Sequence, residues 1–204
     1  MKLYFVRHGE TAWNKLKRVQ GLTDIPLNEY GIYLAEQTAV GLKDIPIDIA
    51  FSSPLIRARQ TAETILTGRE IPIYDDSRIQ EISFGKAEGM VYCKEKCSDE
   101  TKEINKFFND TANYQVPEGG ESVKELMERV KGFLKDICSR EELQDSSVLI
   151  STHGAALKAM MNSIKGITDE ARFWEGGVAK NCAVSEVLVE NHIPKIIKEN
   201  IVFY

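Results

Sequence analysis

The sequence predicts an α/β fold, a single-domain layered structure with a mostly parallel central sheet flanked by helices and a C-terminal hairpin strand pair. Short apolar runs of strand length alternate with segments of helical apolar spacing, the order that builds parallel sheets. Of the 204 residues, 43% are hydrophobic and 28% are charged, a balance typical of a globular protein with one core. Because no repeat, low-complexity tract or linker interrupts the chain, we expect one domain over residues 1–204.

Six short runs rich in apolar residues have the length of strands. The last two are separated by residues 190–192 and predict a hairpin. The predicted strands are residues 3–6, 47–51, 71–74, 148–151, 182–189 and 193–198. In a parallel sheet the ligand crevice lies beyond the carboxyl ends of the strands, so functional side chains are expected there.

Four segments between the strands predict helices. Asn28 is suited to cap the first, and Ser53 and Pro54 fit the N-cap and first position of the second. Ser122 and Glu125 form a capping box at the start of the third. The predicted helices are residues 28–42, the segment between Ser53 and Gly68, residues 122–137 and residues 155–164.

Charge and composition exclude several classes of protein. The net charge of −5 argues against a nucleic-acid partner. Residues 1–60 nevertheless hold eight Lys or Arg against six Asp or Glu, which suits a small anion bound in a cleft. No apolar stretch approaches the length of a membrane span or a signal-peptide core, so we expect a cytoplasmic protein without a membrane partner.

The four cysteines indicate free thiols, because the chain has no secretion signal. Cys93 and Cys97 are four positions apart, but no second Cys or His pair at zinc-ligand spacing follows nearby. The sequence therefore predicts no metal site. The cysteines are Cys93, Cys97, Cys138 and Cys182.

Two of the three histidines share one local construction, in which an apolar strand ends in a polar residue, then His, then Gly. His8 is followed by Gly9, and His153 is followed by Gly154. Both imidazoles would project into the crevice, and each glycine would let the backbone turn closely around a ligand. His192 has no such glycine and lies in the predicted hairpin turn, where we expect it to be exposed.

Three arginines accompany these histidines. Arg7 precedes His8, and Arg57 and Arg59 lie in the first turns of the predicted helix after Pro54. A guanidinium can donate two parallel hydrogen bonds to phosphate oxygens, and the N-terminus of a helix attracts anions. A solvated surface charge is the alternative for an arginine on a helix, and it applies more to Arg59 than to Arg57.

Six segments, taken in order, resemble the signature of the histidine phosphatase superfamily, the phosphoglycerate-mutase-like proteins. Together they span about residues 2–160 and are far more specific than a lone Arg-His-Gly triplet. They are Arg7-His8-Gly9-Glu10-Thr11 with Asn14; Gln20-Gly21 with residues 24–27 and Gly31; residues 52–62; residues 81–85 with Glu88-Gly89; residues 119–122; and Ser151-Thr152-His153-Gly154.

The resemblance implies that His8 is a nucleophile that forms a phosphohistidine. An imidazole is nucleophilic when neutral, which its ordinary pKa near 6.5 allows at pH 7. Arg7, Arg57 and a cationic His153 would clamp the charge that spreads over the transferred phosphoryl oxygens. No metal or cofactor is implied. Further substrate contacts are expected from Thr11, Asn14, Gln20, Gly21, Arg59 and Gly154.

The resemblance also indicates Glu81 as the general acid that protonates the leaving oxygen and then as the base for water. Its segment mixes apolar residues with the carboxylate, and partial burial would raise its pKa as required. An ordinary surface glutamate is the alternative without the resemblance. Glu10, beside the nucleophile, is a weaker candidate for the acid.

Three functions fit these residues. The expected one is a metal-independent phosphomonoester hydrolase that acts on a small phosphorylated metabolite through a phosphohistidine. A cofactor-dependent phosphoglycerate mutase is the alternative. A non-catalytic module that binds phosphorylated ligands is disfavoured, because every catalytic position is present. The sequence is compatible with a homo-oligomer.

The segment of about residues 82–118 should contribute a lid and separates the first two functions. Mutases of the family carry an arginine-containing lid insertion that grips a second phosphoryl group, whereas this segment has five lysines and no arginine. Ala87 stands where many phosphatases of the family have a tryptophan. The phosphatase is favoured over the mutase. The lysines are Lys86, Lys94, Lys96, Lys102 and Lys106.

Overall fold

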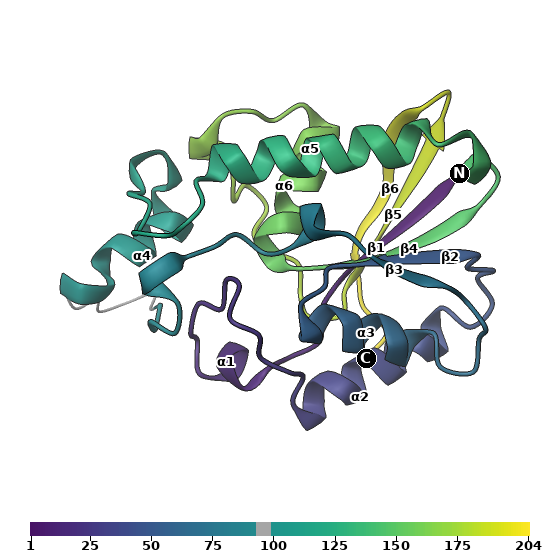
Figure 1. Cartoon of the computed structure of the whole chain (residues 1–204), viewed down its shortest axis with the longest axis horizontal. Helices are drawn as coiled ribbons and strands as arrows, with labels where there is room; N and C mark the ends of the chain where they lie inside the picture. The colour runs from purple at the N-terminus through teal and green to yellow at the C-terminus, as the bar shows by residue number, and fades with distance from the viewer. Residues whose placement is uncertain (93–98) are drawn as a thin grey trace.

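The computed structural model describes residues 1–92 and 99–204 (Figure 1). Within these residues, six strands form one sheet in the order β3-β2-β4-β1-β5-β6. The pairs β1·β4, β2·β4 and β2·β3 are parallel, whereas β1·β5 and β5·β6 are antiparallel. The expected α/β class with a C-terminal strand pair is confirmed. The strands are β1 (Lys2–Arg7), β2 (Ile49–Ser52), β3 (Ile73–Asp75), β4 (Ser147–Thr152), β5 (Val184–Glu190) and β6 (Ile193–Ile201).

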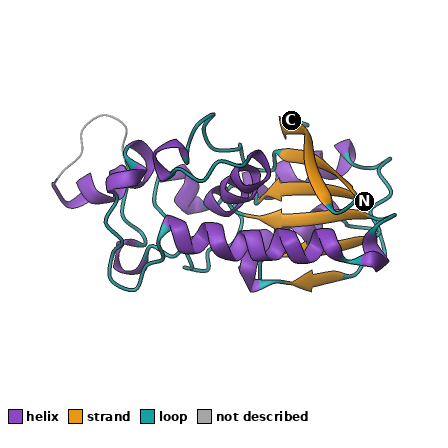
Figure 2. Cartoon of the chain, turned by 90° about the horizontal axis from the view of Figure 1, so that it is seen from above, coloured by secondary structure: helices purple, strands orange, loops and turns teal. Residues whose placement is uncertain are grey.

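Helices cover both faces of the sheet (Figure 1), with α2 and α3 on one side and α5 and α6 on the other. Figure 2 shows that helices and loops, among them α4, extend beyond one end of the sheet. The helices are α1 (Ala12–Lys15), α2 (Glu29–Gly41), α3 (Ile56–Ile65), α4 (Asp99–Asn109), α5 (Val123–Ser139) and α6 (Gly154–Lys165). Short 3₁₀ helices lie at Ser77–Ile79, Gly85–Ala87, Thr111–Asn113, Glu141–Leu143 and Glu170–Arg172.

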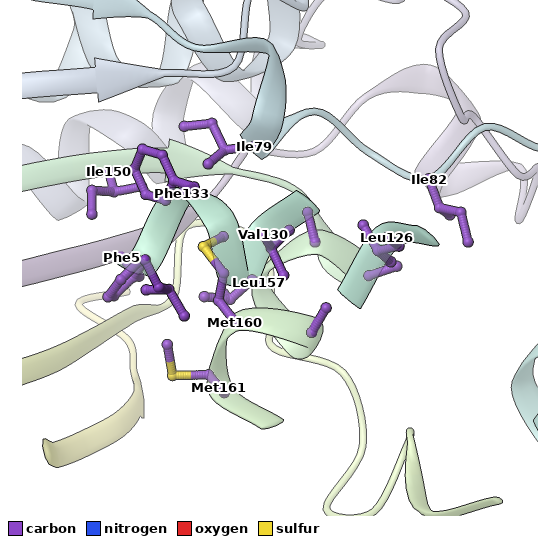
Figure 3. Packing of buried hydrophobic residues seen from close by; sticks show 14 of the residues in the cluster. Phe5, Ile79, Ile82, Leu126, Val130, Phe133, Ile150, Leu157, Met160 and Met161 are labelled. Carbon is purple, nitrogen blue, oxygen red and sulfur yellow. The ribbon is translucent and has the colours of Figure 1, made fainter. Parts of the chain in front are cut away.

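The sheet separates two apolar cores. Along β1, Leu3 and Phe5 belong to the core under α5 and α6, while Tyr4 and Val6 belong to the core under α2 and α3. Successive strand residues point to opposite faces, and a strand that is buried on both faces is therefore apolar throughout. Figure 3 shows part of the first core, where Phe133 of α5 lies among buried side chains of the sheet and of α6.

Capping residues in the sequence correctly predicted where α2 and α5 begin. The Asn28 side chain accepts a hydrogen bond from the Gly31 amide at 2.7 Å, and Ser122 and Glu125 form the expected capping box. The predicted start of α3 at Ser53 is wrong, because the helix begins at Ile56 and ends at Ile65. The Ile56 amide donates to the Asp24 carboxylate at 2.7 Å, a contact from a remote loop that no local pattern encodes.

Other boundaries also differ from expectation. The third strand lies at Ile73–Asp75 instead of residues 71–74, and α6 begins at Gly154 with His153 as its N-cap. The sequence did not indicate α1 or α4, although Phe107 of α4 is fully buried. Cys93, Lys94, Lys96 and Cys97 lie outside the described residues.

We expect Phe133→Ala to lower the free energy of unfolding by about 3–5 kcal/mol, because it leaves a cavity between α5 and the sheet. The ring contacts Phe51 edge-on, with 6.3 Å between centroids, and the Arg78 guanidinium lies over it. Denaturant unfolding measures the effect. The control is Tyr33→Ala, whose residue on α2 is 47% exposed and should cost less than about 1 kcal/mol. Equal losses in the two variants would contradict this packing role.

Candidate active site

A cavity of about 530 Å³, its open mouth included, lies beyond the carboxyl ends of β1 and β4. The polar part of its wall contains Arg7, His8, Arg57, Glu81 and Gly154. The parallel pairing of β1 with β4 continues past the strand ends, because the His8 amide donates to the Thr152 carbonyl at 2.9 Å. His8 and His153 consequently lie side by side, with ring centroids 5.1 Å apart.

The tautomer of His8 follows from its neighbour. Its Nδ1 lies 2.7 Å from the Gly9 carbonyl oxygen, which only accepts hydrogen bonds, so Nδ1 carries the proton and Nε2 keeps its lone pair. Burial, followed by the charges of Arg57 and Arg7, holds the pKa of His8 well below its ordinary value of 6.5. The site therefore presents a neutral imidazole, the form that attacks phosphorus.

Arg57 connects the second histidine to a loop. Its Nε donates to His153 Nδ1 at 3.1 Å, Nη1 donates to the Thr23 carbonyl at 2.9 Å, and Nη2 donates to the Gly21 carbonyl at 2.7 Å. Burial lowers the pKa of Arg57 to about 10, so the group remains a cation at neutral pH. Three of the five N–H donors are used, and two remain for a ligand.

The expectation that His153 is a cation is wrong for this structure. Because Nδ1 accepts from Arg57, the proton lies on Nε2, which donates to the Ser53 hydroxyl at 2.7 Å. Burial and the charge of Arg57 hold the pKa of His153 well below 6.5. His153 is a neutral partner of the arginine, and the positive charge of the site comes from the guanidinium groups.

Glu81 lies at the start of α6. Its carboxylate accepts from the amides of Ala155 and Ala156 at 3.1 Å each, and from its neighbour Ile82 at 3.1 Å. Amides at a helix N-terminus stabilise a negative charge. Glu81 also provides the attraction that partly offsets the lowering of the Arg7 pKa by burial.

Arg7 faces Glu81 across an open space. Its Nη1 donates to the Ala179 carbonyl at 2.6 Å, while its buried Nε has no hydrogen-bond partner among the described residues. A Cβ at Gly154 would lie 3.5 Å from Arg7 Nε and 3.6 Å from Glu81 Oε2. The missing side chain of Gly154 keeps this space free for a ligand.

Gly9 has a different role from the expected one. Its amide donates to the Thr61 hydroxyl at 2.9 Å, and a Cβ here would lie 2.5 Å from the Gly31 carbonyl oxygen. Gly9 therefore permits close packing against α2 and not an approach to a ligand. Glu10 likewise turns away from the cavity lining and accepts from the Asn28 side chain at 2.8 Å.

The expected substrate contacts fall into two groups. Asn14, Gln20, Gly21 and Gly154 line the cavity, whereas Thr11 and Arg59 do not. Thr11 is fully buried and donates to the Gln20 side chain at 2.9 Å.

Arg59 pairs with Glu63 and Asp75, each at 2.9 Å. It lies two positions after Arg57 on α3, which is about 200° around the helix, so it faces away from the cavity.

The outer half of the cavity has an aromatic wall. The Trp174 indole donates to the Phe107 carbonyl at 2.6 Å, which ties the loop after Arg172 to α4. Arg18 also lines the cavity and donates to the Gly89 carbonyl at 2.6 Å. The lysines of residues 82–118 that the structure describes are absent from the lining. The aromatic wall consists of Phe84, Tyr92, Phe107, Phe108 and Trp174.

Sequence reasoning missed two residues that organise this site. Ser53 was interpreted as a helix cap, but its hydroxyl orients His153. The Asn181 side chain donates to the His8 carbonyl at 2.9 Å and lies 173 positions away in the sequence. Nothing in the pattern around Asn181 indicated this contact.

Two features are absent from the part of the chain that the structure describes, a metal-binding cluster and a membrane-spanning helix. No group of three or more His, Cys, Asp or Glu that could hold a metal ion occurs in residues 1–92 and 99–204. Over the same residues, no helix has the length and apolarity needed to cross a membrane.

Comparisons with known proteins show which family this chain belongs to. The family model of the histidine phosphatase superfamily (branch 1) matches residues 3–202. A probable phosphoglycerate mutase GpmB from Escherichia coli is 35% identical over 187 residues, covering 92% of this chain and 84% of its own. The solved structure of Bacillus stearothermophilus YhfR is 31% identical with a TM-score of 0.89, covering 98% of this chain and 97% of its own.

A phosphoserine phosphatase from Entamoeba histolytica is also similar. A mutant of it in complex with phosphoserine is 26% identical with a TM-score of 0.80, and the match covers 98% of this chain and 96% of the other. A structure of this phosphatase in complex with 3-phosphoglyceric acid is 27% identical with a TM-score of 0.78, and the match covers 98% of this chain and 97% of the other. The resemblance found in the sequence motifs is confirmed.

We expect His8→Asn to weaken the dependence of stability on pH. Below pH 6.5 the unfolded chain binds a proton at this imidazole that the native protein does not bind, so wild-type stability falls as the pH falls. Between pH 7 and 5.5, one such histidine accounts for a loss of about 1 kcal/mol. Denaturant unfolding of both proteins at the two pH values measures the difference. An unchanged pH dependence in the variant would mean that His8 is protonated in the native protein.

Proposed function

Because the chain belongs to the histidine phosphatase superfamily, we propose that it is a metal-independent phosphomonoester hydrolase with His8 as its nucleophile. The observation that carries the proposal is the state of His8, a buried neutral imidazole with a free Nε2 beside two arginines. A positioned neutral nucleophile with fixed cations nearby meets the main demands of phosphoryl transfer.

The reaction has two displacements. In the first, His8 Nε2 bonds to phosphorus, the ester P–O bond breaks, and Glu81 gives its proton to the leaving oxygen. In the second, water attacks the phosphohistidine, Glu81 takes a proton from that water, and the P–N bond breaks to release phosphate. Arg7 and Arg57 stabilise the charge on the phosphoryl oxygens in both steps. The enzyme returns to its starting protonation state.

The cavity wall favours hydrolysis over mutase activity. A mutase must hold a second charged group of a bisphosphorylated cofactor. Among the described lining residues outside the phosphate clamp, Arg18 is the one cation. The aromatic wall instead supports an apolar organic part of the substrate, because stacking on aromatic faces needs no charge. The mutase remains the second candidate, since GpmB carries that name.

The proposal predicts that wild-type protein forms a phosphohistidine and that His8→Ala does not. With a labelled phosphomonoester, the label on wild-type protein should be acid-labile and base-stable, as expected for a phosphoramidate. The released product should be inorganic phosphate, and EDTA should leave the rate unchanged because arginines supply the positive charge.

The same assay includes 3-phosphoglycerate with and without 2,3-bisphosphoglycerate. Conversion to 2-phosphoglycerate that depends on the bisphosphate would identify the mutase. Ligand binding without turnover would identify the binding module. His8→Ala activity within tenfold of wild type would exclude His8 as the nucleophile.

A second prediction separates the acid from the charge clamp. Glu81→Gln should slow single-turnover phosphorylation of His8 by an alkyl phosphate by roughly 10²–10⁴-fold, because an alkoxide needs a proton to leave. A nitrophenyl phosphate, whose phenolate leaves without protonation, should be slowed far less. Arg7→Met is the comparison variant and should slow both substrates by similar factors. Equal losses on both substrates in Glu81→Gln would show that Glu81 acts without donating a proton.

A further inference from the structure

We propose that Arg129 and Glu121 are positioning residues that fix Glu81 for proton transfer. The inference rests on the proposed role of Glu81 as proton donor. Neither residue lies in the cavity lining, so neither contacts a ligand there. Glu121 belongs to a motif that the proposed reaction leaves unexplained, and Arg129 lies on α5 outside all of the motifs.

Every N–H group of the Arg129 guanidinium is occupied. Nε and Nη2 form a two-pronged ion pair with Glu121, at 2.5 Å and 2.7 Å. Nη1 donates to the carbonyls of Arg78 at 2.8 Å and Gln80 at 2.9 Å, and Nη2 also donates to the Glu81 carbonyl at 3.0 Å. These bonds use all five donors of the group. No donor remains for a ligand, so the contribution of Arg129 to this region is structural placement.

The segment that receives these bonds runs from the 3₁₀ helix Ser77–Ile79 into residues 81–83, which have no helical or strand structure. Carbonyls in such a stretch need partners from outside it, because a buried carbonyl without a partner is costly. The Thr152 hydroxyl donates to the Ile79 carbonyl at 2.7 Å. The Glu121 amide donates to the Ser83 carbonyl at 2.9 Å. Glu121 therefore holds the segment directly and also through Arg129.

This anchorage determines where the carboxylate of Glu81 lies. Its hydrogen bonds to Ala155 and Ala156 are 3.1 Å long, so a small displacement of the Glu81 backbone would break them. Proton transfer depends on donor placement, and a misplacement of about 1 Å can cost roughly 10²-fold in rate. Loss of the anchor should therefore affect the proton-transfer step selectively.

The test is Arg129→Lys, which keeps the charge but cannot form the two-pronged pair and the three carbonyl bonds together. We expect single-turnover phosphorylation of His8 by an alkyl phosphate to slow roughly 10- to 100-fold, with little change in KM and a loss below about 3-fold for a nitrophenyl phosphate. Arg140→Lys is the matched control, because Arg140 follows the same helix and pairs with Asp136 at 3.0 Å. It should leave both rates unchanged. Glu121→Gln is the second variant in case Arg129→Lys does not fold.

A double variant distinguishes positioning from a general structural effect. In the Glu81→Gln background no proton is delivered, so adding Arg129→Lys should cost little more on the alkyl phosphate. Equal losses on both substrates, or fully multiplicative losses in the double variant, would overturn the positioning role. If Glu81→Gln itself shows no leaving-group dependence while His8 is still phosphorylated, the proton-donor assignment fails and this inference fails with it, but the hydrolase proposal stands.

Discussion

The parallel pairing of β1 with β4 is the constraint on which the site depends. Arg7 is paired with Thr152, and the next residue along each strand is a histidine. A shift of this register by one residue would turn the side chains of one strand to the opposite face. It would also separate His8 from His153, which are 145 positions apart in the sequence. The apolar residues of β1 and β4 fill cores on both faces of the sheet, so the packing that stabilises the fold also fixes the distance between the two imidazoles.

The electrostatics of the site follow from burying cations beside these imidazoles. A buried guanidinium is unfavourable unless its donors are satisfied, and for Arg57 the carbonyls of Gly21 and Thr23 do this. The Glu88 carboxylate in turn accepts from the Thr23 amide at 2.8 Å and holds that loop in place. Burial, followed by this fixed positive charge, lowers the pKa of His8 and of His153 and keeps both imidazoles neutral. One set of contacts thus positions both the arginine of the proposed phosphate clamp and the proposed nucleophile.

The sequence predicted the sheet and the helices that cover its two faces, and it singled out Arg7, His8, Arg57 and Glu81, which the structure brings together in the cavity wall. These features depend on local periodicity, on capping residues and on motifs that lie at strand ends. It did not predict that His153 accepts a hydrogen bond from Arg57, because the protonation of an imidazole depends on neighbours from distant segments. The start of α3 was missed for the same reason, since Asp24 caps it from another loop. Arg59 was misplaced because its motif gives no indication of which side of the helix faces the sheet edge.

The position of Glu81 raises a chemical question for the proposed reaction. Its carboxyl group accepts hydrogen bonds from the amides of Ala155 and Ala156, whereas a general acid must also carry a proton. The proposed scheme uses this one carboxyl group twice, as the acid of the first displacement and as the base of the second. Departure of the leaving group takes the proton from Glu81 and leaves a carboxylate at the site. The site then has a base ready for water when the phosphohistidine has formed, which is the order of events that hydrolysis requires.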